Sequence, residues 1–324
     1  MKTRLKQRSV RSVKVLSLFD GISAGYEALI RAGISVEKYT AYEIDEGAIK
    51  IALKNHPDIE EKGSVIGADF TEFNGVDLLI GGSPCQDLSL AGRMDGLQGE
   101  QSRLFFEFVR ALKEAEPKYF LFENTPMKEA DRNIITRELG CEPVVIDASL
   151  VSAQMRKRLY WTNIPLGQIE DRGIYLEDVV EKDALVDREK AHAIIGSIGR
   201  TTHREYFRKN QGQLVWRAVE FSNIYGGWGE KKPRVHVDKS VTIRTSAGGG
   251  HIPCLLVEGK EFSVEDIKKC TRKVTPLECE RLMTFPDGYT DVGISPTQRY
   301  KCLGNSWVCE VIKEIFKGLK EEKE

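Results

Sequence analysis

Between Lys14 and Pro165 two kinds of segment alternate along the sequence, and this alternation constrains the fold most. Short runs that are apolar throughout are typical of parallel strands covered on both faces. Six such runs occur: Val15 to Leu18, Tyr39 to Glu43, Asp77 to Ile80, Tyr119 to Phe122, Val144 to Asp147 and Leu159 to Thr162. Amphipathic helical patterns separate them, over Ile22 to Ala32, Glu46 to Asn55, Ser102 to Ala115 and Glu129 to Leu139. The alternation predicts an α/β fold with a doubly wound, mostly parallel sheet.

The pattern changes after Pro165. Up to about Leu256 the chain is richer in glycine, aromatic and basic residues, which predicts a second, smaller domain. Helical patterning returns over Pro276 to Met283 and again over Thr297 to Leu319, where Trp307 is expected in the core. The expected division of the chain is therefore 1–13, 14–165, 166–256 and 257–324.

Composition narrows the class of protein. The chain has 324 residues, and 48 basic against 49 acidic residues give a formal net charge of -1. A polyanion would therefore have to meet a local basic patch. No apolar run approaches the roughly 20 residues of a membrane-spanning helix. Seven cysteines without regular spacing argue for a reducing compartment and against disulfides or a zinc cluster, so we expect a cytoplasmic protein.

Polar residues follow the first three strands. The first turn contains Gly21 and Gly25, four apart rather than in the dinucleotide pattern GxGxxG, so it predicts a cofactor close to the backbone without a diphosphate cradle. Glu43 ends the second strand, where a carboxylate can accept two ribose hydroxyls. Asp69 is either a further acceptor or the N-cap of a helix after Phe70.

The glycine-rich loop after the third long strand is the most informative stretch. Cys85 lies there between Pro84 and Gln86, a setting that predicts a thiol facing a cleft and acting as a nucleophile. Glu123 and Asn124 end the neighbouring strand, so an acid and an amide come to the same edge of the sheet. A thiolate and a carboxylate placed together can add to an electron-poor ring and protonate it.

Gln154, Arg156 and Arg158 alternate along the chain just before the last strand of this series. They would share one face if the segment is extended. The alternative is a solvated run of charge.

These motifs, in this order, resemble those of the cytosine carbon-5 methyltransferases. The resemblance rests on the FDGxxxG turn, Pro84-Cys85-Gln86, Glu123-Asn124, the QxRxR run and Gly304-Asn305-Ser306. The block around Cys85 and the Arg103 to Phe108 helix are most similar to the vertebrate de novo enzymes, whereas Gln86 is typical of bacterial and phage members. There are two departures from the family: Ser23-Ala24 replaces a double glycine common in bacteria, and Thr125 replaces valine.

The resemblance implies a methyltransferase fold that binds S-adenosylmethionine, with a target-recognition domain over 166–256 and a C-terminal segment that returns to the catalytic domain over 14–165. It implies that Glu43 binds the ribose, Asp69 the adenine amino group and Ile44 the adenine face. The full set of implied cofactor residues is Phe19, Gly21, Glu43, Ile44, Asp69 and Asn305.

The resemblance also implies the reacting groups. Cys85 would attack ring carbon 6 of a flipped cytosine, Glu123 would hydrogen-bond the ring nitrogen and exocyclic amine, and Arg158 would hold the carbonyl oxygen. Arg156 is placed with them in the catalytic set. The residues expected to contact the substrate are Pro84, Gln86, Asn124 and Gln154.

Double-stranded DNA is the expected partner, with a cognate restriction endonuclease as a further candidate and no metal or membrane. We expect a monomer from a bacterium or phage. From Arg200 to Arg244, ten basic residues against four acids leave six positive charges in excess, which suits phosphate contact but is also compatible with an ordinary exposed face. A transfer RNA methyltransferase and a catalytically inactive module remain alternatives, and the intact set Cys85, Glu123 and Arg158 argues against the second.

Overall fold

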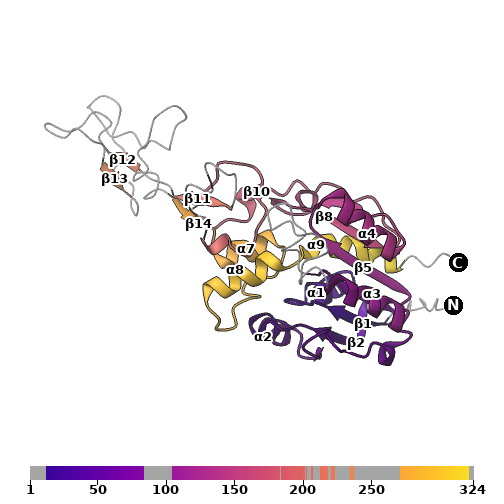
Figure 1. The fold of residues 1–324 in the computed structure, drawn as a ribbon. Coiled ribbons are helices and arrows are strands. Elements are labelled where there is room, and N and C mark those ends of the chain that lie inside the picture. Colours follow the sequence, from indigo (N-terminus) through magenta and orange to yellow (C-terminus); the bar gives the residue numbers. More distant parts are fainter. Residues whose placement is uncertain are drawn as a thin grey trace, which may run out of the picture.

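A seven-stranded sheet forms the centre of the molecule in the computed structural model (Figure 1). The described residues are 12–83, 104–182, 184–200, 202, 206, 212–217, 220–222, 234–236 and 271–320. The strand order is β3-β2-β1-β4-β5-β8-β6. The bounds in that order are Glu60–Glu61, Ser35–Tyr42, Ser12–Leu18, Leu78–Gly81, Tyr119–Asn124, Lys157–Thr162 and Val144–Asp147. All six predicted strands are present, and the predicted α/β fold is confirmed.

Strand direction positions the site. β1, β2, β3, β4 and β5 pair in parallel, so their carboxyl ends meet at one edge of the sheet. β8 pairs antiparallel with both β5 and β6. Because β8 runs the other way, its first residues lie beside the last residues of β5, and Glu123 is opposite Tyr160. The beginning of β8 therefore contributes side chains to the same edge.

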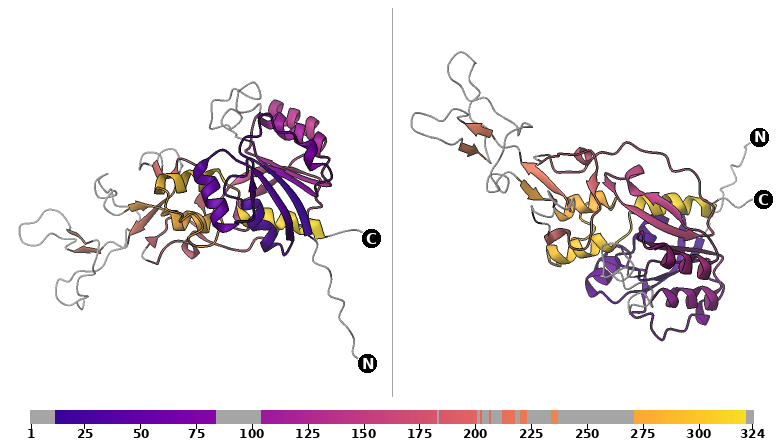
Figure 2. Two further views of the ribbon diagram at one scale, coloured as in Figure 1. Left: turned by 90° about the horizontal axis from the view of Figure 1, so that it is seen from below. Right: turned by 45° about the horizontal axis from the view of Figure 1, so that its top comes forward.

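Helices cover both faces of the sheet, as the continuous apolar strands require. α1 (Ala24–Arg31), α2 (Glu46–Asn55) and α9 (Cys309–Phe316) pack into one apolar cluster with one face of the sheet. α3 (Leu104–Ala115) and α4 (Glu129–Leu139) pack on the other face. Figure 2 shows the magenta α3 and α4 across the sheet from the yellow α9. Alternate residues of β1 follow this division, with Val15 on the first face and Leu16 on the second.

Two further helices lie between the sheet and the smaller strands. α7 (Pro276–Leu282) and α8 (Pro296–Asn305) each begin at a capping box with proline at the first turn. Thr275 caps α7 and Ser295 caps α8. The predicted helix over Thr297 to Leu319 is wrong at its centre, because α8 ends at Asn305 and α9 starts at Cys309. Three residues separate the two helices. The first of them, Ser306, has an extended backbone, so the chain changes direction there.

The remaining described strands are short. β7 pairs with β10, β11 pairs with β9 and β14, and β12 pairs with β13. Their bounds are Gln154–Met155 (β7), Ala184–Leu185 (β9), Ala191–His192 (β10), Leu214–Arg217 (β11), Glu220–Ser222 (β12), Arg234–His236 (β13) and Thr271–Lys273 (β14). The 3-10 turns are Thr71–Phe73 (η1), Ala148–Leu150 (η3), Leu176–Asp178 (η4), Ile198–Arg200 (η5) and Lys317–Lys320 (η6). Much of 166–256 lies outside the described residues.

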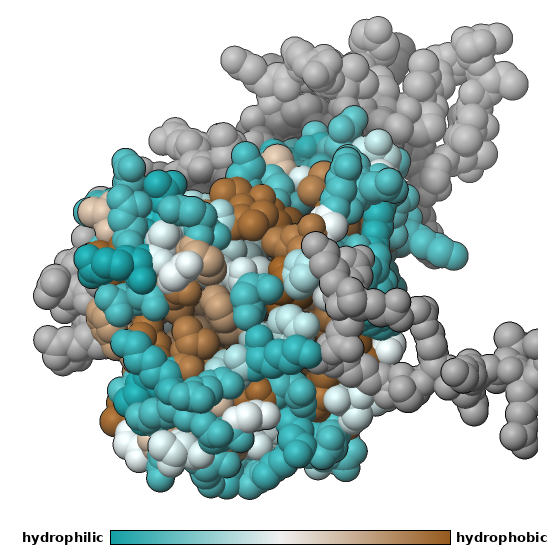
Figure 3. Space-filling model, turned by 90° about the vertical axis from the view of Figure 1, so that its right-hand side faces the viewer, coloured by the Kyte–Doolittle hydropathy of each residue, from teal (hydrophilic) through white to brown (hydrophobic). Residues whose placement is uncertain are grey.

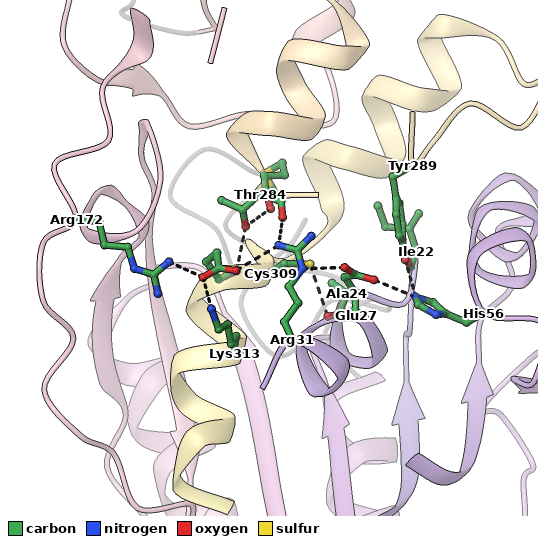
Figure 4. A network of polar contacts seen from close by, with 12 residues as sticks. Ile22, Ala24, Glu27, Arg31, His56, Arg172, Thr284, Tyr289, Cys309 and Lys313 are labelled. Carbon is green, nitrogen blue, oxygen red and sulfur yellow. Dashed lines mark hydrogen bonds and ion pairs between the residues drawn. The ribbon is translucent and has the colours of Figure 1, made fainter. Parts of the chain in front are cut away.

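The C-terminal segment is tied to the first helix by a polar network (Figure 4). Arg31 donates to the Thr284 carbonyl at 2.5 Å and pairs with Glu310 at 3.3 Å. Arg172 approaches Glu310 from the other side at 2.5 Å. Tyr289 donates its hydroxyl to the Ile22 carbonyl in the turn after β1, at 2.9 Å. Residues near both ends of the chain therefore form one unit.

Apolar side chains are also exposed in places. Figure 3 shows one face of the molecule, on which hydrophobic residues gather between hydrophilic ones. Val144 and Val145, at the start of the edge strand β6, are among the exposed apolar residues. Val144 pairs with Tyr160, which pairs with Glu123 on its other side, so Val144 lies level with Glu123 across β8. Among the described helices, none is long and apolar enough to cross a membrane.

Candidate active site

A buried carboxylate organises the turn after β1. Asp20 accepts hydrogen bonds from the Ser17 hydroxyl at 2.5 Å, from the Tyr39 hydroxyl at 2.6 Å and from the Ser23 hydroxyl. Burial raises the pKa of Asp20, and these three donors oppose that rise by stabilising its charged form. The turn is thus held from β1, from β2 and from its own residues.

The backbone of this turn is strained. Phe19 and Ser23, neither of them glycine, have φ 58°, and Gly21 has φ 62°. Such left-handed conformations in side-chain-bearing residues concentrate at functional sites. Gly25 is needed for another reason, because a Cβ there would lie 2.4 Å from Ile80 Cδ1. This glycine lets α1 pack directly on β4.

Glu43, just after β2, binds the same turn. Its Oε2 accepts the Gly21 N–H at 2.8 Å, and its Oε1 accepts the N–H groups of Ile44 and Asp45, each at 2.8 Å. Ile44 beside it is 75% exposed, which is unusual for isoleucine. A carboxylate and an exposed apolar surface therefore lie together at the carboxyl ends of β1 and β2.

Asp69 is exposed and accepts two hydrogen bonds from Thr71, from its N–H at 3.0 Å and from its hydroxyl at 2.6 Å. These bonds lower the pKa of Asp69. The N-cap of η1 is Phe70, without a side-chain cap, so Asp69 is not the N-cap that the sequence allowed as an alternative; its bonds close a local turn onto Thr71. Both bonds use Oδ1, so the contact leaves Asp69 able to accept a further donor at Oδ2.

Glu61, at the end of β3, was not anticipated. Within the described structure neither of its buried carboxylate oxygens has a hydrogen-bond partner. Burial, with smaller contributions from Asp20 and Glu43, raises the pKa of Glu61 to about 8. Three acids therefore gather at the ends of β1, β2 and β3, and the third is mostly protonated at neutral pH.

The loop that begins at the end of β4 runs against the end of β5. A Cβ at Gly82 would lie 3.0 Å from Glu123 Oε2, so glycine permits this close approach. The Asn124 amide lies 3.4 Å from both the Ser83 carbonyl and the Ser83 hydroxyl. Asn124 is buried, and this contact accounts for its position. The next residues, Pro84, Cys85 and Gln86, lie outside the described residues.

Glu123 lies between two donors from distant segments. Arg158 Nε is 3.0 Å from Glu123 Oε1, and both side chains are largely buried, 14% and 13% exposed. Trp307 Nε1 donates to Glu123 Oε2, also at 3.0 Å. The structure thus brings together Glu123 and Arg158 as the sequence predicted. Trp307 was expected in the core and is instead half-buried at this carboxylate.

Gln154 and Arg156 share one face, as predicted, but that face meets the protein itself. Gln154 Oε1 accepts the Ile194 N–H at 3.1 Å, and its amide donates to the Leu282 carbonyl at 2.6 Å. Arg156 donates to the Ile194 carbonyl, and to the carbonyls of Gly304 at 3.1 Å and Ser306 at 3.0 Å. Both side chains are buried and hold the C-terminal segment in place. The sequence had predicted instead that Gln154 contacts the substrate and that Arg156 belongs to the catalytic set.

Arg156 holds the segment that contains Asn305. The preceding residue, Gly304, packs so closely that a Cβ there would lie 2.2 Å from the Gly196 nitrogen. Asn305 itself is exposed, and its Oδ1 would lie 3.0 Å from a Cβ at Gly196. No group of three potential ligands that could hold a metal ion is found within the described part of the chain.

Comparison with known proteins decides the family. The family model of the C-5 cytosine-specific DNA methylases matches residues 13–321. The chain belongs to this family. It is therefore a methyltransferase, and its family implies S-adenosylmethionine as the methyl donor.

Two curated relatives match over most of their length. Type II methyltransferase M1.ScrFI of Lactococcus lactis subsp. cremoris is 28% identical over 327 residues, covering 98% of this chain and 80% of the relative. Type II methyltransferase M.HhaI of Haemophilus parahaemolyticus is 27% identical over 335 residues, covering 96% and 95%. Among solved structures, the Entamoeba histolytica methyltransferase EhMeth has a TM-score of 0.69 at 16% identity and covers 96% of this chain and 100% of its own, which supports the fold.

Proposed function

We propose that this methyltransferase transfers a methyl group to carbon 5 of a flipped cytosine in double-stranded DNA through a covalent adduct with Cys85. One observation carries the proposal. In a chain of this family, Glu123 is ion-paired with Arg158 at the end of β5, directly against the Gly82-Ser83 loop that leads to Cys85.

The turn after β1 fits S-adenosylmethionine. Glu43 lies where it can accept the ribose hydroxyls, exposed Ile44 can pack on the adenine face, and Asp69 can accept the adenine amine. A Cβ at Gly21 would meet nothing within 4 Å, so the turn is open there. Phe19 and Asn305 complete the proposed set. When bound, the cofactor supplies an electrophilic methyl group.

Chain geometry supports Cys85 as the nucleophile. Only two peptide units separate it from Ser83, so their Cα atoms are at most about 7.6 Å apart. Ser83 in turn contacts Asn124, the neighbour of Glu123. In the sequence, Cys85 therefore follows two residues after the one that contacts the neighbour of Glu123. In this proposal Pro84 and Gln86 contact the substrate beside it.

The residues act in order on the ring. The Cys85 thiolate forms a bond to carbon 6, and the electrons of the carbon 5–carbon 6 double bond shift toward carbon 5. As the adduct forms, ring nitrogen 3 takes a proton from the Glu123 carboxyl group. Glu123 then accepts hydrogen bonds from this N–H and from the exocyclic amine, while Arg158 donates to the carbonyl oxygen. Carbon 5 would then take the methyl group that the cofactor supplies, which leaves S-adenosylhomocysteine. A base would remove the carbon 5 proton, and the bond between the Cys85 sulfur and carbon 6 would break to restore the ring double bond. Because carbon 5 is inaccessible in a stacked duplex, the base must leave the helix.

The region 166–256 is proposed to select the target sequence. It carries the local positive excess and lacks the βα alternation, and the residues assigned to chemistry lie outside it. Substituting Arg200 and the other arginines up to Arg244 singly should separate phosphate contacts, which weaken binding to all sequences, from base contacts, which relax specificity at one base pair. Unchanged site preference and salt dependence across the series would refute this assignment. The restriction endonuclease partner stays a prediction.

Trapping with a modified base tests the mechanism. Duplex DNA that contains 5-fluorocytosine should form a denaturation-resistant complex, since fluorine cannot leave as a proton does. Cys85→Ala should abolish both the complex and methyl transfer. Cys141→Ala is the matched control, because this half-buried thiol lies after α4, outside the proposed site. Methylation retained by Cys85→Ala would refute the mechanism, and methylation of transfer RNA in place of DNA would refute the substrate.

A further inference from the structure

The orientation of the Glu123 carboxylate depends on two donors, one for each oxygen. Arg158 lies 3.0 Å from Oε1 and Trp307 lies 3.0 Å from Oε2. The last side-chain torsion of glutamate is broad, so one donor would leave the carboxylate plane free to turn. Donors on both oxygens restrict that rotation, and each oxygen keeps a second lone pair for a ligand.

The position of Trp307 is set by contacts with several parts of the chain that are distant in the sequence. It lies in the break between α8 and α9, directly after Ser306, whose carbonyl accepts from Arg156 at 3.0 Å. A Cβ at Gly82 would lie 3.2 Å from Trp307 Nε1, and one at Gly25 would lie 3.7 Å from its ring. The indole therefore spans the distance from α1, beside the cofactor turn, to the carboxylate on β5.

We infer that Trp307 is a positioning residue, whose indole N–H holds Glu123 in the orientation needed to bind cytosine. The inference rests on the proposed function, because Glu123 is taken to contact the base. A hydrogen bond to a charged acceptor is stronger than one between neutral groups. A carboxylate held in advance need not reorganise when the base arrives. The return of the C-terminal segment thus supplies part of the catalytic geometry as well as packing.

A purely structural role for Trp307 makes a different prediction. Phenylalanine keeps an aromatic ring at this position but removes the N–H. If Trp307 only fills space, Trp307→Phe should change thermal stability and leave the turnover of the folded enzyme unaltered. If the N–H positions Glu123, the same change should lower kcat while the KM for DNA and the Kd for S-adenosylmethionine stay within about threefold of wild type.

The test compares Trp307→Phe with Trp161→Phe in the full chain. Trp161 is the matched control because its indole also donates one hydrogen bond at 3.0 Å, to Thr136 on the other face of the sheet. We expect kcat to fall about 10- to 100-fold in Trp307→Phe and to stay near wild type in Trp161→Phe. In a Glu123→Gln background, Trp307→Phe should cause little further loss, because both changes act through one carboxylate.

A second measurement does not depend on activity. The chain has four tryptophans, so ¹⁵N-indole labelling yields few signals, and Trp307→Phe assigns one of them. That signal should shift in Glu123→Gln. A wild-type chain that methylates no DNA would overturn the proposed function and the inference together. An active wild type with equal turnover in Trp307→Phe, or an unshifted indole signal, would overturn the inference alone.

Discussion

Replacing Glu43 by alanine tests whether its carboxylate binds the cofactor or only supports the turn after β1. Glu43 accepts three backbone N–H groups, each at 2.8 Å, including that of Gly21. It is also the proposed acceptor for the ribose hydroxyls. Loss of one hydrogen bond to a charged group costs about 1.5–3 kcal/mol, so Glu43→Ala should raise the Kd for S-adenosylmethionine about 10- to 150-fold.

Calorimetric titration measures this change directly, with S-adenosylhomocysteine as a second ligand. Glu43→Gln should lie between wild type and Glu43→Ala, because one side-chain oxygen remains. Glu37→Ala is the matched control, since Glu37 is an exposed glutamate earlier on β2. An analogue that lacks the ribose hydroxyls should bind wild type weakly and lose little more in Glu43→Ala. Unchanged affinity in Glu43→Ala, with or without a loss of stability, would refute a role in cofactor binding.

Three further outcomes are expected. Glu280→Ala should lower the free energy of unfolding by about 3–5 kcal/mol in denaturant titrations, because it leaves the guanidinium of Arg299, 3.0 Å away, without its buried partner. Gly304→Ala should cost about 1–3 kcal/mol or more and weaken cofactor binding in calorimetry, since its methyl group would press on the backbone at 195–196. The pKa of Glu61 is about 8 in the folded protein and about 4.3 when the chain is unfolded. Between these two pH values the folded state binds a proton that the unfolded state has lost. The free energy of unfolding contributed by Glu61 therefore falls by up to about 1.4 kcal/mol per pH unit as the pH rises from about 4.3 to about 8. Glu61→Gln should flatten this decline in melts from pH 5 to 9, and an identical profile would contradict the assignment.

Hydrophobic patterning predicted the sheet because its strands are buried on both faces. All six predicted strands and the four predicted helices among them occur, with shifts of a few residues at their ends. β3 was missed because Glu60 and Glu61 form a strand of two acidic residues without a hydrophobic pattern. Such an edge strand exists only through pairing with β2, which the sequence does not encode locally.

The break before α9 could not be predicted from periodicity. Val311, Ile315 and Leu319 are buried, so the apolar spacing continues through the point where the helix ends. Trp307 fits that spacing but lies at Glu123. The only signal in the sequence is its position directly after Gly304-Asn305-Ser306.

Strand ends alone predicted that Gly21 and Glu43 would lie together, whereas the place of Arg158 with Glu123 was implied only by the resemblance to the family. Glu123 and Arg158 meet because β5 and β8 are neighbours, and Gly21 meets Glu43 because β1 and β2 are neighbours. The partners of Gln154 and Arg156 come from segments around 194, 282 and 304, far away in the sequence. Tertiary packing over such separations overrides the local charge pattern.

The pairing of α1 with α9 also sets the order in which the enzyme can mature during its synthesis. The contacts from Arg31 to Glu310 and from Ile22 to Tyr289 span 279 and 267 residues. Until α9 has been made, the apolar side of α1 has no cover, and until residue 289 has been made the cofactor turn lacks Tyr289. Contacts of such separation slow folding, and uncovered surface favours aggregation. A nascent or truncated chain without α9 should therefore be more prone to aggregate, and the cofactor turn should be complete only after α9 has left the ribosome.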